Sequence, residues 1–374
     1  MAAKKSPKVA PEFTRTRDFI RRYTSIADHY LDIVTVWMMT TWCFSPACES
    51  PATMPYLYIT GQKGSGKTVL GQDVAGMICR NHTPTVGITG PGVFRIIGDY
   101  DPETGQVISN APTLALDEID ATFSGAKDEA LRQMLNAGYR RGAMVPRAAG
   151  KTVINYPVHC PKIMMGIENG HLPDTVLDRS IRIPMHRATP EQMATLEPFY
   201  VFDAEDEGAE ISQELSDWAK DHSMVLRDYR PTAIPGLSPR QWEIARTLVQ
   251  IAHEIGNEEQ IREALAVAMA ETKPQGKDRL YQAIFDLFED LDTDRVTTKQ
   301  IMAQLQAYDV HVPGDSGKGL SAVLSEEGIA PNYIKLPKGH PGNRHGEEKA
   351  DTQRGYFLRM FDTAFVKYLK DEEE

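Results

Sequence analysis

The sequence predicts an α/β fold: a parallel sheet packed between helices, followed by a smaller C-terminal domain. Apolar strand-like runs at 56–60, 112–116 and 162–167 alternate with helical patterns, as in βαβ units. The turn-rich run at 272–276 marks a change in composition and predicts a domain boundary near residue 273. A length of 374 residues with 41% hydrophobic content is enough for two or three domains with their own cores.

A glycine-rich loop follows the first predicted strand and suits the chemistry of a triphosphate. Residues 61–68 read G-Q-K-G-S-G-K-T, and a helix is predicted from Val69 to Arg80. Glycines let successive backbone N–H groups surround a phosphate, Lys67 reaches its outer oxygens, and Thr68 offers a hydroxyl to Mg²⁺. The predicted nucleotide contacts are Gly61, Gly64, Ser65, Gly66, Lys67, Thr68 and Val69. The alternative is a plain glycine turn with an unused lysine.

An acidic pair, Asp117 and Glu118, ends the second apolar run. A carboxylate at the carboxyl end of a strand can hold Mg²⁺ through water, and its neighbour can polarise an attacking water. We therefore predict that Asp117 binds the metal and that Glu118 is the catalytic base. The alternative is a strand that ends in an acidic turn. Asp120 is expected to cap the next helix.

Two β-forming runs, at 143–148 and 152–156, predict a hairpin with a basic tip. Arg147 and Lys151 lie near this tip and are candidates for contact with DNA. Such a hairpin can project into the pore of a ring and hold a phosphate backbone. It can equally be an exposed hairpin with solvated charges, and both interpretations stay open.

The order of these motifs resembles that of an AAA+ ATPase. It runs from the phosphate loop to the Asp-Glu strand, then to a strand ending at Asn169, and then to Asp178-Arg179. The stretches 131–142 and 172–181 further resemble an uncharacterised family of ATPase domains from bacteriophages and integrated mobile elements. The resemblance covers about 33–256 and implies ATP hydrolysis by a replication-type motor or initiator.

The resemblance also assigns roles to single residues of this chain. It implies that Lys67 and Thr68 contact phosphate and Mg²⁺, that Asp117 binds the metal and that Glu118 is the base. Asn169 takes the first sensor position, and Arg179 takes that of an arginine acting on the nucleotide of a neighbouring subunit. The helical block at 191–272 resembles the AAA+ lid, in which Arg240 would contact the γ-phosphate. The alternative for Arg240 is a plain helix-start arginine.

Beyond residue 273 the element order resembles a winged helix. Helices are predicted at about 277–291, 297–307 and 317–325, strands at 333–336 and 355–360, and a last helix after them. Between 335 and 370, eight Lys or Arg outnumber four Asp or Glu. Lys318, Lys338 and Arg344 are therefore candidates for DNA contact. Winged helices also bind proteins, and that alternative stays open.

Net charge, cysteine usage and the apolar segments argue against several classes of function. A net charge of −11 argues against coating of nucleic acid by bulk attraction, so DNA contacts must come from local basic patches. The four cysteines have neither metal-ligand spacing nor the density of a disulfide scaffold, as expected in a reducing cytoplasm. The apolar segment 33–44 is too short to span a bilayer, and no secretory signal precedes it. No membrane association is expected.

The expected domains are a basic arm with an N-terminal helix (1–50), the nucleotide-binding domain (51–190), the lid (191–272) and the winged helix (273–374). Residues 1–17 are predicted to be a disordered basic arm, either solvated or touching DNA. Together these motifs predict a protein that hydrolyses ATP and assembles into a homo-oligomeric ring, such as a hexamer. This ring would act on DNA as a helicase, helicase loader or initiator. The alternative is an ATP-dependent switch that docks a host replication or regulatory protein without moving along DNA.

Overall fold

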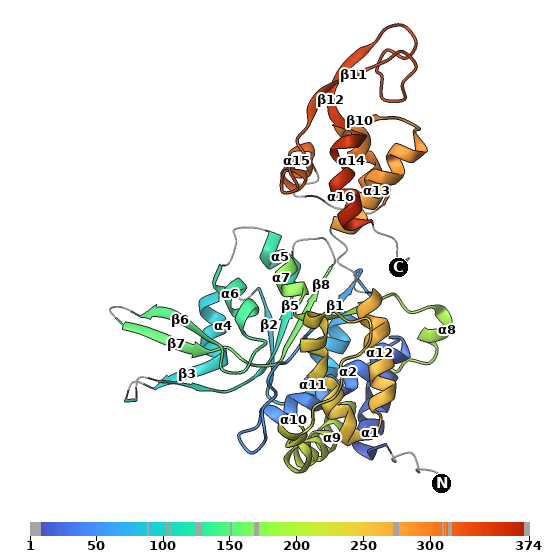
Figure 1. Cartoon of the computed structure of the whole chain (residues 1–374). Helices are drawn as coiled ribbons and strands as arrows, with labels where there is room; N and C mark the ends of the chain where they lie inside the picture. Colours follow the sequence, from blue (N-terminus) through green and yellow to red (C-terminus); the bar gives the residue numbers. More distant parts are fainter. Residues whose placement is uncertain are drawn as a thin grey trace. The chain divides into compact units, whose positions relative to one another are not determined.

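A computed structural model describes residues 9–87, 90–101, 103–104, 106–124, 129–149, 152–167, 172–271, 277–308, 310, 312 and 316–369. The chain forms two compact units, Met1–Thr272 and Lys273–Glu374 (Figure 1). The division lies where the composition of the sequence changes.

The first unit is built on a five-stranded sheet in which every pair of neighbours is parallel. Its strands are β1 (Tyr56–Gly61), β2 (His82–Val86), β5 (Thr113–Asp117), β8 (Lys162–Gly166) and β9 (Ser180–Met185), in the order β2-β5-β8-β1-β9. β1, β5 and β8 are buried along almost their whole length, as parallel strands covered on both faces require. The predicted α/β fold with a parallel sheet is confirmed. We call the sheet edge where these strands end the carboxyl edge, and the opposite one the amino edge.

The helices of the first unit are α1 (Pro11–Tyr23), α2 (Asp28–Thr40), η1 (Thr41–Phe44), η2 (Val69–Val74), α3 (Ala75–Ile78), α4 (Gly90–Ile97), α5 (Ile119–Ser124), α6 (Glu129–Ala137), α7 (Asp174–Leu177), α8 (Pro190–Met193), α9 (Val201–His222), α10 (Val225–Asp228), α11 (Pro239–Ile255) and α12 (Glu258–Glu271). Helix α2 is buried from Tyr30 to Thr40 and packs against α1, α11 and α12 (Figure 1). Helices α1 and α2, which precede the sheet in the sequence, therefore pack in one layer with α11 and α12, which follow it.

Residues 11–17 do not form the predicted disordered arm. They open α1, whose Phe19 and Ile20 are fully buried. Arg15 forms ion pairs with Glu210 and Glu214 of α9. Because these carboxylates lie about two hundred positions away in the sequence, nothing local indicated that the basic residues have partners. The acidic stretch 203–210 forms the largely exposed first turns of α9.

Two antiparallel hairpins accompany the sheet. β6 (Met144–Ala149) and β7 (Thr152–Pro157) confirm the predicted hairpin, although Lys151 lies outside the described residues. β3 (Gly98–Asp101) and β4 (Gln106–Ser109) form a second hairpin, which the sequence analysis did not predict. β4 contacts β7, and this packing, which propensity does not encode, explains the difference.

The second unit has a separate core and a three-stranded antiparallel sheet in the order β10-β12-β11. Its elements are α13 (Lys277–Asp290), β10 (Arg295–Thr297), α14 (Thr298–Ala307), α15 (Gly317–Ser325), β11 (Asn332–Leu336), β12 (Asp351–Phe357), η4 (Leu358–Met360) and α16 (Asp362–Tyr368). The predicted helices and two longer strands are present, and β10 is an addition. None of the helices described in either unit is long and apolar enough to cross a membrane.

Candidate functional site

The glycine-rich loop connects β1 to the helical turns η2 and α3 at the carboxyl edge. Gly64 and Gly66 have φ values of 80° and 87°, which residues with a Cβ rarely adopt. At Gly61 an added Cβ would lie 2.2 Å from the carbonyl oxygen of Met185 on β9. The backbone at these three positions therefore favours glycine.

Lys67 folds back over the loop that precedes it. Its Nζ donates to the carbonyl oxygens of Gly61 at 2.6 Å and Gln62 at 3.0 Å. Burial lowers the pKa of Lys67, while the carboxylates of Asp117 and Asp120 oppose this shift. The lysine is thus within electrostatic range of both carboxylates.

Ser65, in the middle of the loop, offers a test of whether a phosphate fits. Its side chain is buried, and its Oγ has no hydrogen-bond partner among the described residues. A buried hydroxyl without a partner is costly, so it marks a position where an acceptor is expected. A phosphate oxygen would satisfy this demand, so the residues of the loop are compatible with a phosphate.

Asp117 lies at the same edge of the sheet as the loop. β8 stands between β1 and β5, with Met164 paired to both Leu116 and Tyr58, so all three strands end side by side. Gln72, on the helical turn after the loop, donates from Nε2 to Oδ2 of Asp117 at 2.8 Å. The structure thus brings Lys67, Thr68 and Asp117 together, with Thr68 exposed to solvent.

Glu118 follows Asp117 in a strained conformation. Its φ is +52°, in the left-handed region that a residue with a long side chain rarely enters. Its backbone N–H donates to Oδ1 of Asp117 at 2.8 Å, and its side chain is exposed. Backbone strain of this kind costs on the order of 1 kcal/mol and concentrates at functional sites.

Asp120 does not cap α5 as predicted, because the helix already begins at Ile119. Its Oδ1 instead accepts a hydrogen bond of 3.2 Å from the backbone N–H of Ile167, just beyond β8. This contact joins the ends of β5 and β8 at the carboxyl edge. Asn169, the predicted sensor, lies outside the described residues.

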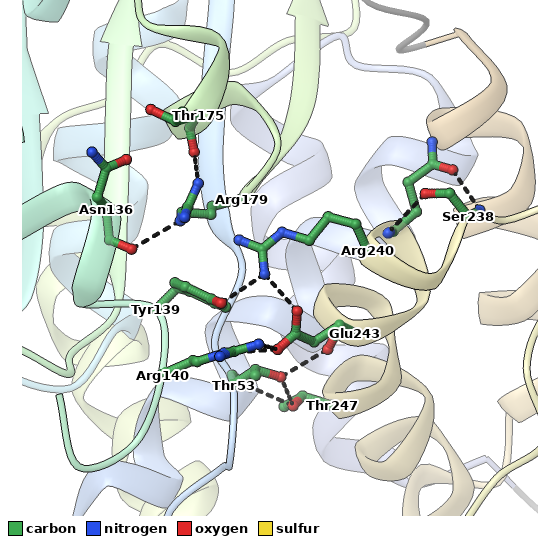
Figure 2. A network of polar contacts seen from close by, with 11 residues as sticks. Thr53, Asn136, Tyr139, Arg140, Thr175, Arg179, Ser238, Arg240, Glu243 and Thr247 are labelled. Atoms are coloured by element: carbon green, nitrogen blue, oxygen red, sulfur yellow. Dashed lines mark hydrogen bonds and ion pairs between the residues drawn. The ribbon is translucent and has the colours of Figure 1, made fainter.

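Arg179 and Arg240 lie at the amino edge, the edge away from the loop, and Figure 2 shows their contacts. The carbonyl oxygen of Arg179 accepts from the N–H of Tyr56, the first residue of β1, at 2.9 Å. Arg240 donates to the hydroxyl of Tyr139 at 2.6 Å. β1 has six residues, so about 16 Å of strand separates this edge from the loop.

The prediction that Arg240 contacts the γ-phosphate of its own chain does not hold in this arrangement. The start of α11 packs at the amino edge, where Thr53 Oγ1 donates to the carbonyl oxygen of Glu243 at 2.8 Å. Arg240 is therefore directed away from the loop by the docking of its helix. Its side chain is also more than a plain helix-start arginine, because it contacts both Tyr139 and Glu243.

Of the predicted DNA contacts, two arginines are engaged within the chain itself. Arg147 is half-buried over the ring of Phe94 and donates to the carbonyl oxygen of Ala130 at 3.2 Å. Arg344 binds Asp351 through two hydrogen bonds of 2.8 Å. Lys318 and Lys338 are exposed.

Sequence reasoning missed Gln72, Tyr139 and Glu243. Gln72 carried a usable signal, because it lies one helical turn after Thr68 and so shares its face. Tyr139 and Glu243 carried none, since their contact depends on how the end of α6 meets α11.

A protein-family profile described as "Protein of unknown function (DUF3631)" matches residues 185–368. This is slightly less than half of the chain, and it covers α8 to α12 and most of the second unit. The glycine-rich loop and Asp117 lie outside the match. No curated protein matches the chain. The similarity therefore concerns the helical segment and the second unit, and it brings no known activity with it.

Proposed function

We propose that the chain is a Mg²⁺-dependent ATPase of the AAA+ type that acts on DNA in bacteriophage or mobile-element replication. The observation that carries the proposal is the joint placement of Lys67 and Asp117 at the carboxyl edge. In parallel α/β sheets, ligands bind outside the carboxyl ends of the strands. The buried hydroxyl of Ser65, for which the described part of the chain offers no hydrogen-bond partner, supports a phosphate at this place.

The proposed chemistry is phosphoryl transfer from ATP to water. Backbone N–H groups between Gly61 and Val69 and the Nζ of Lys67 would hold the phosphates, which requires Lys67 to leave its two loop carbonyls. Mg²⁺, when bound, neutralises charge that develops on the phosphate oxygens. Thr68 and Asp117 are the residues that would hold it, with Gln72 orienting the carboxylate. Glu118 would accept a proton from the attacking water.

The second unit supports a role on DNA. Its order of helix, strand, two helices and two strands, followed by α16, is compatible with a winged helix, in which α15 would be the recognition helix. Lys318 on α15 and Lys338 after β11 expose their charges. We propose that these two lysines contact the phosphate backbone, and that 191–272 serves as the lid.

A second candidate function is favoured by the partners of the basic residues. Arg15 and Arg17 are paired with carboxylates of the first unit, Arg147 with α6, and Arg344 with Asp351. Fewer unpaired basic side chains are therefore available to contact DNA than the sequence suggested. This favours an ATP-dependent switch or adaptor that docks a protein, without movement along DNA.

The experiment that tests the proposal measures ATP binding and turnover with and without single-stranded DNA. Lys67→Ala is expected to abolish binding of MgATP, whereas Lys63→Ala, an exposed lysine of the same loop, is the matched control and is expected to bind normally. Retained binding in Lys67→Ala would contradict the site. Strong stimulation of turnover by DNA supports the motor, and unchanged turnover supports the switch.

A further inference from the structure

One face of the strands β11 and β12 is open to solvent and carries an aromatic side chain. Figure 1 shows both strands extending past the helices of their own unit. Tyr333 and Lys335 alternate on β11 with Ile334 and Leu336, which are fully buried. Tyr333 is 82% exposed, more than any other large hydrophobic side chain among the described residues of the second unit. Antiparallel sheets commonly turn polar side chains toward water, so the exposed ring is the distinctive feature of this face.

Basic side chains flank the ring on both strands. The register places Tyr333 opposite Arg354 and Lys335 opposite Thr352, and residues directly opposite each other in an antiparallel pair lie on the same face. Lys335, Thr352 and Arg354 are exposed. We call Tyr333, Lys335, Thr352 and Arg354 the Tyr333 face. It combines one aromatic ring with two cations, and none of its four members is acidic.

The chain between the two strands covers the opposite face. Gln353 lies opposite Ile334, on the side that holds the buried residues of β11. Its Nε2 donates to the carbonyl oxygen of Gly342 at 2.7 Å, which fastens the segment 337–350 over this side. His340 of the same segment is buried. The segment thus completes the packing of one face of the strands and leaves the Tyr333 face open.

The start of α15 borders the Tyr333 face. Thr298, the first residue of α14, donates from Oγ1 to the carbonyl oxygen of Arg354 at 3.3 Å. An added Cβ at Gly317, the first residue of α15, would lie 2.9 Å from Cγ2 of Thr298. Lys318 follows Gly317 directly, so the lysine proposed above as a phosphate contact belongs to the border of this face.

An unpaired strand of nucleic acid fits this combination of side chains. Its bases present flat π-faces on which a tyrosine ring stacks, and its phosphates pair with lysine and arginine. A duplex presents only base edges in its grooves, because its base faces are stacked on one another. An exposed ring between two cations therefore matches a single strand better than a duplex.

We propose that the Tyr333 face binds single-stranded DNA, with one base stacked on Tyr333 and the adjoining phosphates on Lys335 and Arg354. The inference rests on the proposed action on DNA and narrows the substrate to an unpaired strand. Stacking on the ring supplies affinity that depends little on salt, whereas the two cations supply the part that salt weakens. The two contributions are thus separable by experiment.

The test is fluorescence anisotropy of the full chain with labelled oligothymidylate of about 20 nucleotides, a duplex of the same length and oligouridylate. The unmodified protein is expected to bind the single DNA strand at least about tenfold more tightly than the duplex. Tyr333→Ala should raise the Kd for the single strand by about 5- to 100-fold, whereas Tyr333→Phe, which keeps the ring, should change it by less than about twofold.

Phe202→Ala is the matched control for loss of an exposed ring. Phe202 is 85% exposed, but it lies in the first unit and is followed by Asp203 instead of a basic residue. Its replacement should leave the Kd for the single strand within about twofold of the unmodified protein. An equal loss in Phe202→Ala and Tyr333→Ala would overturn the assignment to the Tyr333 face.

Salt separates the ring from the cations. The slope of log Kd against log salt concentration should fall by about 0.7 in Lys335→Ala and in Arg354→Ala, because each removes one phosphate contact on a single strand. Tyr333→Ala should keep the slope of the unmodified protein. A strand that carries iododeoxyuridine should also cross-link to Tyr333 under ultraviolet light, and mass spectrometry identifies the modified residue. A slope that falls in Tyr333→Ala would contradict a stacking contact.

The outcomes separate this inference from the proposed function. If Tyr333→Ala binds the single strand as the unmodified protein does, or the duplex binds as tightly as the single strand, the Tyr333 face is wrong while the action on DNA stands. If oligouridylate binds at least about tenfold more tightly than oligothymidylate, the ligand is RNA and the assignment to DNA is wrong. If the unmodified protein binds none of the three, the inference and the proposed action on DNA fail together, and the nucleotide site is unaffected.

Discussion

The side-chain amide of Gln72 donates to Asp117 across 2.8 Å, joining the helical turn after the phosphate loop to the end of β5. The contact leaves Oδ1 of Asp117 to the backbone N–H of Glu118. One carboxylate thus joins two chain segments, and both of its oxygens accept a hydrogen bond that fixes its orientation.

Loss of this orientation should weaken the response to Mg²⁺. Asp117→Asn removes the charged ligand, so the Mg²⁺ concentration for half-maximal turnover should rise by more than about tenfold. Gln72→Ala removes only the hydrogen bond that orients this ligand, so the same concentration should rise by about tenfold. Asp73→Asn, the next residue along, is the control. Titration of turnover with Mg²⁺ at saturating ATP measures this, and overlapping curves for Gln72→Ala and the unmodified protein would contradict the role of Gln72.

Replacement of the predicted base should separate binding from chemistry. Glu118→Gln keeps the size and the backbone of Glu118 but cannot accept a proton, so turnover should fall by about 10² to 10³ while ATP binding stays within about twofold. Single-turnover measurements with labelled ATP check this. Unchanged turnover in Glu118→Gln would refute the assignment.

The N-terminal helix should behave as part of the core. Phe19 is 1% exposed, so Phe19→Ala is expected to cost about 3 to 4 kcal/mol of unfolding free energy. Arg21→Ala, which removes a half-exposed side chain of α1 paired with Asp28, should cost less than about 1 kcal/mol. The four tryptophans, Trp37, Trp42, Trp218 and Trp242, all lie in the first unit, so their fluorescence during urea unfolding reports this unit alone. Equal losses for the two variants would mean that α1 is not packed as described.

The second unit should lose stability in acid. Hydrogen bonds from Arg344 hold the pKa of Asp351 well below its ordinary value of 3.8. A carboxyl group with a lowered pKa in the folded state stabilises the fold above its ordinary pKa, and this contribution is lost as the pH falls below about 4. Asp351→Asn should therefore lower the unfolding temperature of the second unit at pH 7 and flatten its decline in acid.

Calorimetry of the whole chain from pH 7 to pH 3 measures this effect, because tryptophan fluorescence identifies the transition of the first unit. Arg354→Gln, on the same strand, is the control. Parallel pH profiles for Asp351→Asn and the unmodified protein would show that the Arg344 pair has no part in acid stability.

The features predicted correctly from sequence were those encoded locally. The glycines at 61, 64 and 66 and the lysine that follows are a contiguous pattern, and the apolar run before Asp117 has the length and composition of a buried strand. Their meeting at one edge followed from the rule that parallel strands end together.

The features that were missed depend on partners far away in the chain. Arg15 gave no local sign of Glu210, and Arg240 gave none of Tyr139, because helix docking decides these contacts. Net charge does not show which charged side chains are paired. Arg147 and Arg344 were therefore taken as free charges, although both form contacts within the chain. Local patterns therefore predicted that the glycine-rich loop and Asp117 lie at one edge, but they did not predict the contacts of Arg179 and Arg240.

Helix α2, buried against α11 and α12, has a consequence for synthesis of the chain. Residues 28–40 leave the ribosome early, yet the helices that cover them end at residue 271. Throughout this interval the face of α2 that α11 and α12 cover lacks these neighbours, and such exposure invites aggregation. Productive synthesis is therefore expected to rely on chaperones, and fragments that stop before α11 should be insoluble.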